Sequence, residues 1–262
     1  MGRAKEIIVK VIPAKIANEF VKKHHYSGKI VNNSSLHFGA FLDGRLHGVM
    51  SYGSPFDKSK VINMVYPCLW NEMLELNRMA FNEYLPKNSE SRCIAISIKM
   101  IKKNAPHIKW ILSFSDGAQC GDGVIYRASG FFLTAIKENQ SIIELPNGKR
   151  VASMTFTKGK HILAQNGRAG VPFGSKKIDG FQLRYIYLID KSCKITVPII
   201  PFSKIDEIGA GMYKGEKVSL LSRKPKAPEA HVVERPVSDG EVGGSNPTPA
   251  LQNSNKTETN GI

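Results

Sequence analysis

The segment Ile108–Phe132, IKWILSFSDGAQCGDGVIYRASGFF, contains the pattern from which the fold can be predicted. Its first part, IKWILSF, is apolar at odd and even positions, as in a strand covered on both faces. We expect the strand to end at Asp116, where a glycine-rich corner leads into a short helix around Tyr126. Gly130 is placed to end that helix in a left-handed conformation, and Phe131 to start the next strand. Asp116 would then lie at the carboxyl end of a buried strand, where α/β folds commonly build their sites.

The chain before this segment predicts strands and helices in a mixed order. Asp43-Gly44 is the signature of a tight hairpin between two strands, and Pro13 opens an amphipathic helix. We expect loops at 30–35 and 55–67. The predicted elements are a strand at 6–12, a helix at 13–26, strands at 35–42, at 45–53 and from 71 to near Arg78, and a helix at 89–103. Together with 108–136 they give an α/β core over residues 4–136.

The chain after residue 136 predicts a β-rich, basic extension and then a tail. A hairpin is expected at 142–156, where Pro146-Asn147-Gly148 forms the turn, followed by a basic, glycine-rich stretch at 157–180. A strand at 181–189 has no predicted place in the sheet. Residues 223–262 are rich in Pro, Gly, Asn, Ser and Thr, so we expect a disordered tail after a domain that spans 1–222.

The net charge of +15 predicts a polyanionic partner. Basic and acidic residues are equal in number from Arg223 onward, so the excess lies before that point. A host whose proteins are generally basic is the alternative explanation. DNA is the expected partner, and a solvated loop is the other interpretation of the charged stretch. The residues expected to contact phosphates are Lys158, Lys160, Arg168, Lys176 and Lys177.

The sequence contains no apolar run of the roughly 20 residues that span a bilayer. Its N-terminal apolar run is short and interrupted by Lys10, unlike a signal peptide, so we expect no membrane association and a cytoplasmic protein. The four cysteines are irregularly spaced and form no Cys-x-x-Cys pair, which indicates free thiols. The oligomeric state is left open.

With Asp116 at a strand end and Tyr126 before Gly130-Phe131, the chain resembles the GNAT acyltransferase superfamily over residues 4–136. This resemblance implies a mixed central sheet flanked by helices, and an acyl donor bound where a glycine-rich turn opens a helix. The matching positions here are Arg92, Ala95 and Ser97. Because none of them is glycine, coenzyme A is a doubtful donor and the acyl donor stays unknown. Ala95 and Ser97 as helix-packing residues are the alternative.

A narrower resemblance is to the Mom proteins of bacteriophages, which are DNA-modifying enzymes with a GNAT-like fold. It covers most of residues 15–160 and is carried by His25-Tyr26, Leu76-Asn77-Arg78, Ser115-Asp116, Tyr126 and Gly130-Phe131. The resemblance implies a transferase that places a carbamoylmethyl group on the exocyclic amine of adenine in double-stranded DNA and so protects it from restriction enzymes. Iron dependence is also associated with that family.

Such a reaction assigns a role to each candidate residue. Asp116 would accept or hold the proton of the amine, Tyr126 would protonate the leaving group, and Arg78 would bind a phosphate or carboxylate. Adenine must leave the duplex to react, and Tyr26 or Tyr52 would receive it. The structural alternatives are a loop cap for Asp116, aromatic packing under Phe132 for Tyr126, and an ion pair with Glu75 or Glu83 for Arg78.

If a metal is bound, His25 and Asp116 are the expected first ligands, since His and carboxylate suit non-haem iron. A histidine near the end of a helix is equally expected to be structural. Two other function classes stay open: an N-acetyltransferase that uses acetyl coenzyme A on a small molecule or protein, and a basic DNA-binding protein without enzymatic activity.

Overall fold

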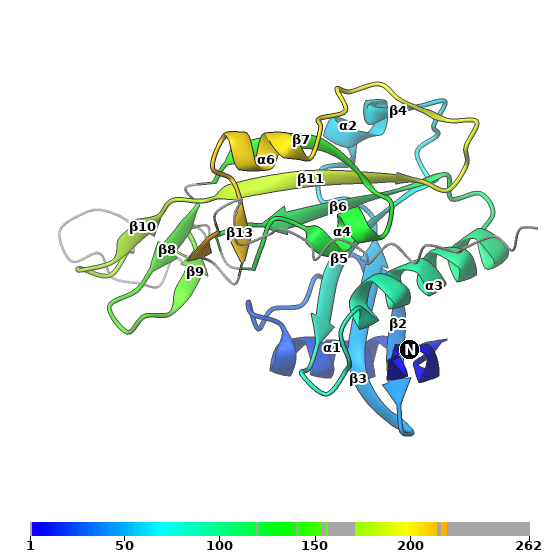
Figure 1. Cartoon of the computed structure of the whole chain (residues 1–262), viewed down its shortest axis with the longest axis horizontal. Coiled ribbons are helices and arrows are strands. Elements are labelled where there is room, and N and C mark those ends of the chain that lie inside the picture. Colours follow the sequence, from blue (N-terminus) through cyan, green and yellow to red (C-terminus); the bar gives the residue numbers. More distant parts are fainter. Residues whose placement is uncertain are drawn as a thin grey trace, which may run out of the picture. The chain divides into compact units, whose positions relative to one another are not determined.

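The computed structural model describes residues 2–118, 120–139, 141–153, 156, 171–213 and 216–218. Its central element is a seven-stranded mixed sheet of order β1-β2-β3-β5-β6-β11-β7 (Figure 1). Every neighbouring pair is antiparallel except β5 and β6. The strands of this sheet are β1 (Ile8–Val11), β2 (Ser34–Leu42), β3 (Arg45–Gly53), β5 (Met73–Phe81), β6 (Trp110–Asp116), β7 (Phe132–Glu138) and β11 (Phe181–Leu188).

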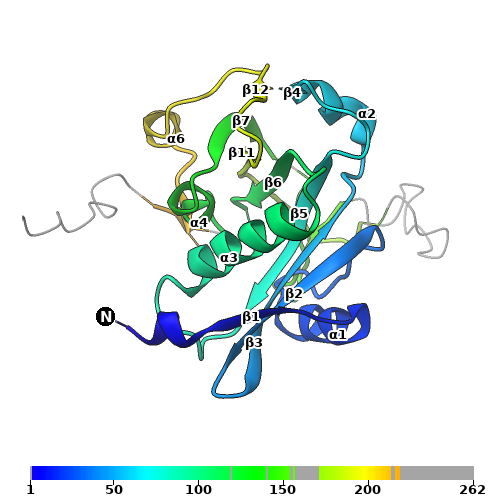
Figure 2. The same ribbon diagram turned by 90° about the vertical axis from the view of Figure 1, so that its right-hand side faces the viewer.

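Helices cover both faces of the sheet (Figure 2). Helix α1 (Ala14–His24) packs with Val49 of β3, whereas α3 (Ser89–Asn104) belongs to the cluster that contains the next residue, Met50. Successive side chains of a strand point to opposite faces, so the two helices lie on opposite sides. The mixed α/β class with flanking helices is therefore confirmed.

The remaining elements are short. They are η1 (Arg3–Glu6), α2 (Lys58–Val61), η2 (Ile62–Met64), β4 (Val65–Tyr66), α4 (Val124–Ala128), β8 (Ile142–Glu144), β9 (Arg150–Ala152), β10 (Lys176–Ile178), β12 (Lys194–Ile195), α6 (Ser203–Glu207), β13 (Met212–Tyr213) and β14 (Glu216–Lys217). No helix among the described residues is long and apolar enough to cross a membrane. Cys68, Cys93, Cys120 and Cys193 are free thiols, as predicted.

The structure differs from the sequence prediction in several places, and two of the differences bear on the cavities described below. Strand β11 lies between β6 and β7, so the central sheet extends beyond residue 136, where the predicted core ended. The predicted loop at 55–67 contains α2, η2 and β4, which pack because Val61 and Val65 are buried against Trp110 and Leu112. The predicted tail, 223–262, lies outside the described residues.

The glycines of the two predicted turns behave as their positions suggest. Asp43 and Gly44 both have positive φ, 50° and 75°, which suits the tight hairpin between β2 and β3. Gly130 has φ 81°, and the N–H of Phe131 donates to the carbonyl of Tyr126 at 3.0 Å. Together with the bond from the Gly130 N–H to the Arg127 carbonyl, this ends α4 in a Schellman motif and fixes the helix that carries Tyr126.

The corner before α4 also requires a glycine at position 123. Its φ is 82°, and a Cβ there would lie 2.5 Å from Cε2 of Tyr185. Tyr185 is fully buried, and its hydroxyl donates to the carbonyl of Asp122, so the ring has no room to retreat. Any side chain at position 123 must therefore displace a core ring as well as adopt a strained backbone.

We predict that Gly123→Ala lowers the free energy of unfolding by roughly 2 to 4 kcal/mol, the sum of backbone strain and overpacking. Gly148→Ala is the matched control, because Gly148 has a similar φ, 76°, but a Cβ added there would meet nothing within 4 Å. It should cost only about 1 kcal/mol. Equal losses for the two variants in urea unfolding would contradict the role of Tyr185.

Candidate active site

Strands β5 and β6 run side by side for only part of their length. Met73–Leu76 pairs in parallel with Trp110–Ser113, after which β5 stays with β3 and β6 stays with β11. A cavity of about 580 Å³ lies where they part, and we call it the central cavity. The polar side chains that line it include His25, Tyr26, Glu75, Arg78, Glu90, Asp116, Cys120, Tyr126 and Gln182.

A bulge in β5 positions Arg78 at this opening. Tyr52 of β3 pairs with Leu76 and Ser51 with Arg78, which leaves Asn77 without a partner in that register. Such an extra residue bends a strand and re-aims the side chains that follow it. The Arg78 side chain donates from Nε to the Lys29 carbonyl at 3.0 Å and from a terminal nitrogen to the Asn77 carbonyl at 2.7 Å.

Arg78 is a cation without a carboxylate partner among the described residues. The ion pair with Glu75 or Glu83 that the sequence left open does not form there; the salt bridges found are elsewhere. Burial lowers the pKa of Arg78, while Tyr26 and Glu75 raise it. A guanidinium in this environment gains from an anionic ligand, because desolvation of a charge is costly until it is paired.

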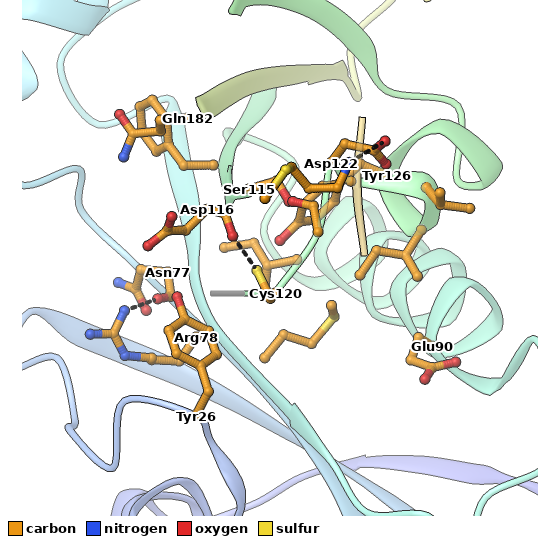
Figure 3. Close-up of a pocket in the computed structure, with 18 of the residues that line it drawn as sticks. Tyr26, Asn77, Arg78, Glu90, Ser115, Asp116, Cys120, Asp122, Tyr126 and Gln182 are labelled. Carbon is orange, nitrogen blue, oxygen red and sulfur yellow. Dashed lines mark hydrogen bonds between the residues drawn. The ribbon is translucent and has the colours of Figure 1, made fainter. Parts of the chain in front are cut away.

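Tyr26 points toward Arg78 and Asp116 across the central cavity (Figure 3). Half of its surface is exposed, and burial of its hydroxyl region raises its pKa, so the phenol keeps its proton at neutral pH. Tyr52, the other tyrosine considered for stacking on a base, is fully buried with its ring edge on Phe38. Only Tyr26 of this pair can meet an extruded base in this conformation.

His25 lies beside Tyr26 at the end of α1. Its Nδ1 is 2.8 Å from the Ser27 hydroxyl and accepts or donates according to its tautomer. Burial, and then the charge of Arg78, lowers its pKa to about 4. His25 is therefore neutral at physiological pH, and its ring is held by Ser27 and by the Tyr26 ring, whose centroid is 4.2 Å away.

Asp116 ends β6, as predicted, and lines the central cavity. Its Oδ1 accepts the N–H of Ala118 at 3.1 Å and the side-chain amide of Asn139 at 3.3 Å. One carboxylate oxygen of Asp116 therefore caps the following loop, which is the role considered as an alternative. The capping bond also fixes the carboxylate at the cavity wall, so the two roles are compatible.

Tyr126 is buried in the wall of the central cavity. Its ring packs on Phe131 and Tyr185 at 5.4 and 5.2 Å between centroids, and not under Phe132, which is 38% exposed. Burial raises the pKa of Tyr126 to about 12, while a hydrogen bond with Ser113 opposes the rise. The phenol is therefore a protonated group that can donate a hydrogen bond or a proton.

Glu75, Cys120 and Gln182 are among the residues of the site that the sequence analysis did not assign. Burial raises the pKa of Glu75 and that of the Cys120 thiol, so Cys120 is not poised as a thiolate nucleophile. Gln182 enters because β11 pairs it with Asp116. Glu75 is a charged residue between apolar neighbours in a strand, and this pattern could have identified it as a site residue. Gln182 could not be identified because the place of β11 was not predicted, and Cys120 could not because the conformation of the corner after β6 was not predicted.

The residues present do not form a metal cage. His25 and Asp116 line the same cavity, but among the described residues there is no group of three His, Cys, Asp or Glu side chains suited to hold an ion. The cation of Arg78 near His25 also disfavours a second positive charge. We therefore derive no step through iron.

The structure does not bring together the three residues that were expected to bind a cofactor. Arg92 and Ala95 line a shallow cavity of about 390 Å³ on α3, apart from the central cavity. Ser97 is fully buried and its hydroxyl is shared with Tyr52 at 2.7 Å, so it acts in helix packing, the alternative stated for it. The Arg92 guanidinium donates to the Lys5 carbonyl at 3.2 Å.

The residues expected to contact DNA lie away from the central cavity where they are described. Lys176 and Lys177 are exposed on β10, in a small sheet with β8 and β9 (Figure 1). Lys158, Lys160 and Arg168 lie outside the described residues. Their contribution to DNA binding stays a prediction.

The model of the Mom protein family matches residues 6–204 of the chain. This chain belongs to the Mom protein family. Methylcarbamoylase mom of Escherichia phage Mu is 32% identical over 197 residues, which are 73% of this chain and 79% of the phage protein. The family resemblance seen in the sequence is confirmed, and His25, Tyr26, Arg78, Asp116 and Tyr126, which carried it, all line the central cavity of this Mom family member.

Solved structures of acetyltransferases are also similar to this chain. An IAA acetyltransferase from Bacillus cereus has a TM-score of 0.41 at 12% identity and covers 70% of this chain and 99% of its own. A GNAT family acetyltransferase from Elizabethkingia anophelis, solved with acetyl-CoA bound, has a TM-score of 0.41 at 13% identity and covers 70% of this chain and 97% of its own.

The low pKa of His25 predicts a loss of stability in acid. The folded protein holds His25 neutral down to a pKa of about 4, whereas the unfolded chain protonates it near the usual value of 6.5. The unfolded state thus binds more protons between these pH values, and the free energy of unfolding should fall by roughly 2 to 3 kcal/mol as the pH drops through this window.

Urea unfolding at several pH values would measure this dependence, with His25→Gln as the comparison. The variant lacks the titrating ring, so its stability should vary less with pH between about 6.5 and 4. The same pH dependence in both proteins would show that His25 is not held neutral by the fold.

Proposed function

We propose that this protein is a DNA-modifying transferase that places a carbamoylmethyl group on the exocyclic amine of adenine in double-stranded DNA. The observation that carries the proposal is that Tyr26, Arg78, Asp116 and Tyr126, which come from four different parts of the chain, line a single cavity at the split in the sheet. The phage Mu relative is named a methylcarbamoylase, after a group that has the same atoms as a carbamoylmethyl group in a different order. The modification would protect the DNA from restriction enzymes in the host cytoplasm.

The reaction forms a bond between the adenine amine nitrogen and the methylene carbon of the donor, and breaks the bond from that carbon to the leaving group. One proton leaves the amine nitrogen and one is gained by the leaving group. Asp116 is placed to accept the first, because its carboxylate is fixed at the cavity wall by Ala118. Tyr126, with a pKa of about 12, keeps its proton at neutral pH and is able to supply the second.

Tyr26 and Arg78 hold the reactants in this proposal. An adenine inside a duplex hides its amine, so the base must swing out, and an exposed aromatic ring gives it a surface to stack on. Tyr26 offers such a ring at the mouth of the cavity. Arg78 has no carboxylate partner among the described residues and would bind an anionic group of the donor or a phosphate of the DNA.

The chemistry of the donor can be inferred only from the residues that line the cavities. Arg92 and Ala95 line the shallow cavity on α3 and would contact an anionic part of the donor, but no glycine stands there to let a backbone approach a pyrophosphate. Iron dependence follows from the family resemblance alone.

The decisive test is mass spectrometry of nucleosides from plasmid DNA of cells that express the protein. We expect a heavier adenosine with the wild-type protein. Asp116→Asn should reduce its amount about 100-fold or more, the usual contribution of a proton acceptor. The variant should be retained on duplex DNA at least as well as the wild-type protein, because the substitution removes a negative charge and no DNA contact.

One result would reject the proposed function, and a second would reject only the role of Asp116. Unmodified adenosine from cells that contain folded wild-type protein would favour an acetyltransferase or a DNA-binding protein without activity. Full modification by Asp116→Asn would keep the function but remove Asp116 from the chemistry. Asn139→Ala is a useful comparison, since it loses one bond to Asp116 Oδ1 without altering the carboxylate, and it should reduce modification only slightly.

A further inference from the structure

A second cavity, of about 390 Å³, adjoins the central cavity. The two share Glu75, Phe114 and Gln182 in their walls. Since Gln182 pairs with Asp116 in the sheet, the shared wall lies next to the proposed site of proton transfer. The other side chains of the second cavity come from the connection between β3 and β5 and from β6, β7 and β11, and they include Phe56, Lys60, Lys137 and Arg184.

Phe56 is the most unusual residue of the second cavity. It is 86% exposed, although it belongs to a connection whose Val61 and Val65 are buried. A backbone hydrogen bond from Phe56 lowers the pKa of Glu75 against the effect of burial, so the main chain of Phe56 is tied to the wall shared by the cavities. The backbone of Phe56 is fixed, and its apolar ring is exposed to solvent beside the site. Such a ring is suited to contact a ligand.

The second cavity also presents cations. Arg184 is half-buried, and its guanidinium donates to the Thr134 hydroxyl and carbonyl, both at 3.0 Å. No carboxylate pairs with it among the described residues. Lys137 lies on the neighbouring strand, opposite Gln182 in register, whereas Lys60 is paired with Asp57 at 2.7 Å. Arg184 and Lys137 thus leave positive charge for an anion.

The connection that carries Phe56 has further exposed aromatic rings next to basic residues. Trp70 is 52% exposed and has the Lys58 ammonium 4.8 Å from its ring centroid, and Tyr66 is 71% exposed. Aromatic rings alternating with cations suit a nucleic acid strand, whose bases stack and whose phosphates pair. A partner protein would need a carboxylate to meet Arg184, and would give no reason for the wall shared with the central cavity.

We propose that the second cavity binds the DNA duplex at the target base, with Phe56 inserted in the base stack where the extruded adenine had been. Arg184 and Lys137 bind the flanking phosphates. The adenine then enters the central cavity past the wall formed by Glu75, Phe114 and Gln182. This inference rests on the proposed function, because it takes duplex DNA as the substrate.

The test compares Phe56→Ala with the wild-type protein on two purified duplexes. One is fully paired, and the other is the same duplex with an abasic site opposite one central adenine, which makes extrusion of that adenine easier. We expect Phe56→Ala to weaken binding to the paired duplex about tenfold, the usual scale for a lost stacking contact, and to bind the abasic duplex nearly as well as wild type. In cells, the variant should yield about tenfold less modified adenosine.

Controls separate this role from a general defect. Phe132→Ala removes another partly exposed phenylalanine, which lines neither cavity, and should bind and modify DNA as wild type does. Phe56→Trp should retain most activity, because an indole also fills the space of a base. Arg184→Ala should weaken both duplexes and reduce the slope of log affinity against log salt by about one.

The outcomes distinguish this inference from the proposed function. If wild-type protein yields no modified adenosine, the proposed function fails. If wild type modifies adenosine and Phe56→Ala, folded by its melting temperature, does so equally and binds both duplexes equally, only the present inference fails. Lost modification with unchanged DNA binding in Arg184→Ala would assign that residue to the donor and overturn its contact with phosphate.

Discussion

The separation of β5 from β6 is the constraint on which the site depends. Two parallel strands that stayed paired would close the sheet, but here pairing ends at Leu76 and Ser113. The bulge at Asn77 turns β5 away, while β6 remains attached to β11 as far as Asp116. The central cavity therefore lies within the sheet, where rigid strands hold its walls and residues from both faces can meet.

The electrostatics of the central cavity follow from this placement. Burial raises the pKa of Tyr126 to about 12 and lowers that of His25 to about 4, so both side chains are neutral at physiological pH. Arg78 is then the cation of this wall, with carbonyl partners but no carboxylate among the described residues. A site of this kind attracts an anionic group to one place and, in the proposed reaction, leaves proton transfer to Asp116 and Tyr126.

The sequence predicted the local elements well, because each had a local signal. The alternation in β5, the hairpin at Asp43-Gly44 and the Schellman glycine at Gly130 are properties of short segments. The place of β11 was not predictable in the same way, since it depends on pairing with strands that are distant in the chain. Gln182 and the wall of the second cavity were missed for that reason. Ser97 shows the converse: a helix position that matches a binding motif is buried here under Tyr52.

A transferase of this kind must bring together two molecules that have no contact in solution, and the arrangement of the two cavities is suited to that task. Each is open to solvent on its own, yet Glu75, Phe114 and Gln182 belong to both. A base that enters from the second cavity would meet the central cavity at the level of Asp116, the strand neighbour of Gln182. Because the shared wall is made of adjacent strands and not of loops, the distance between the two reactants would be set by the sheet itself.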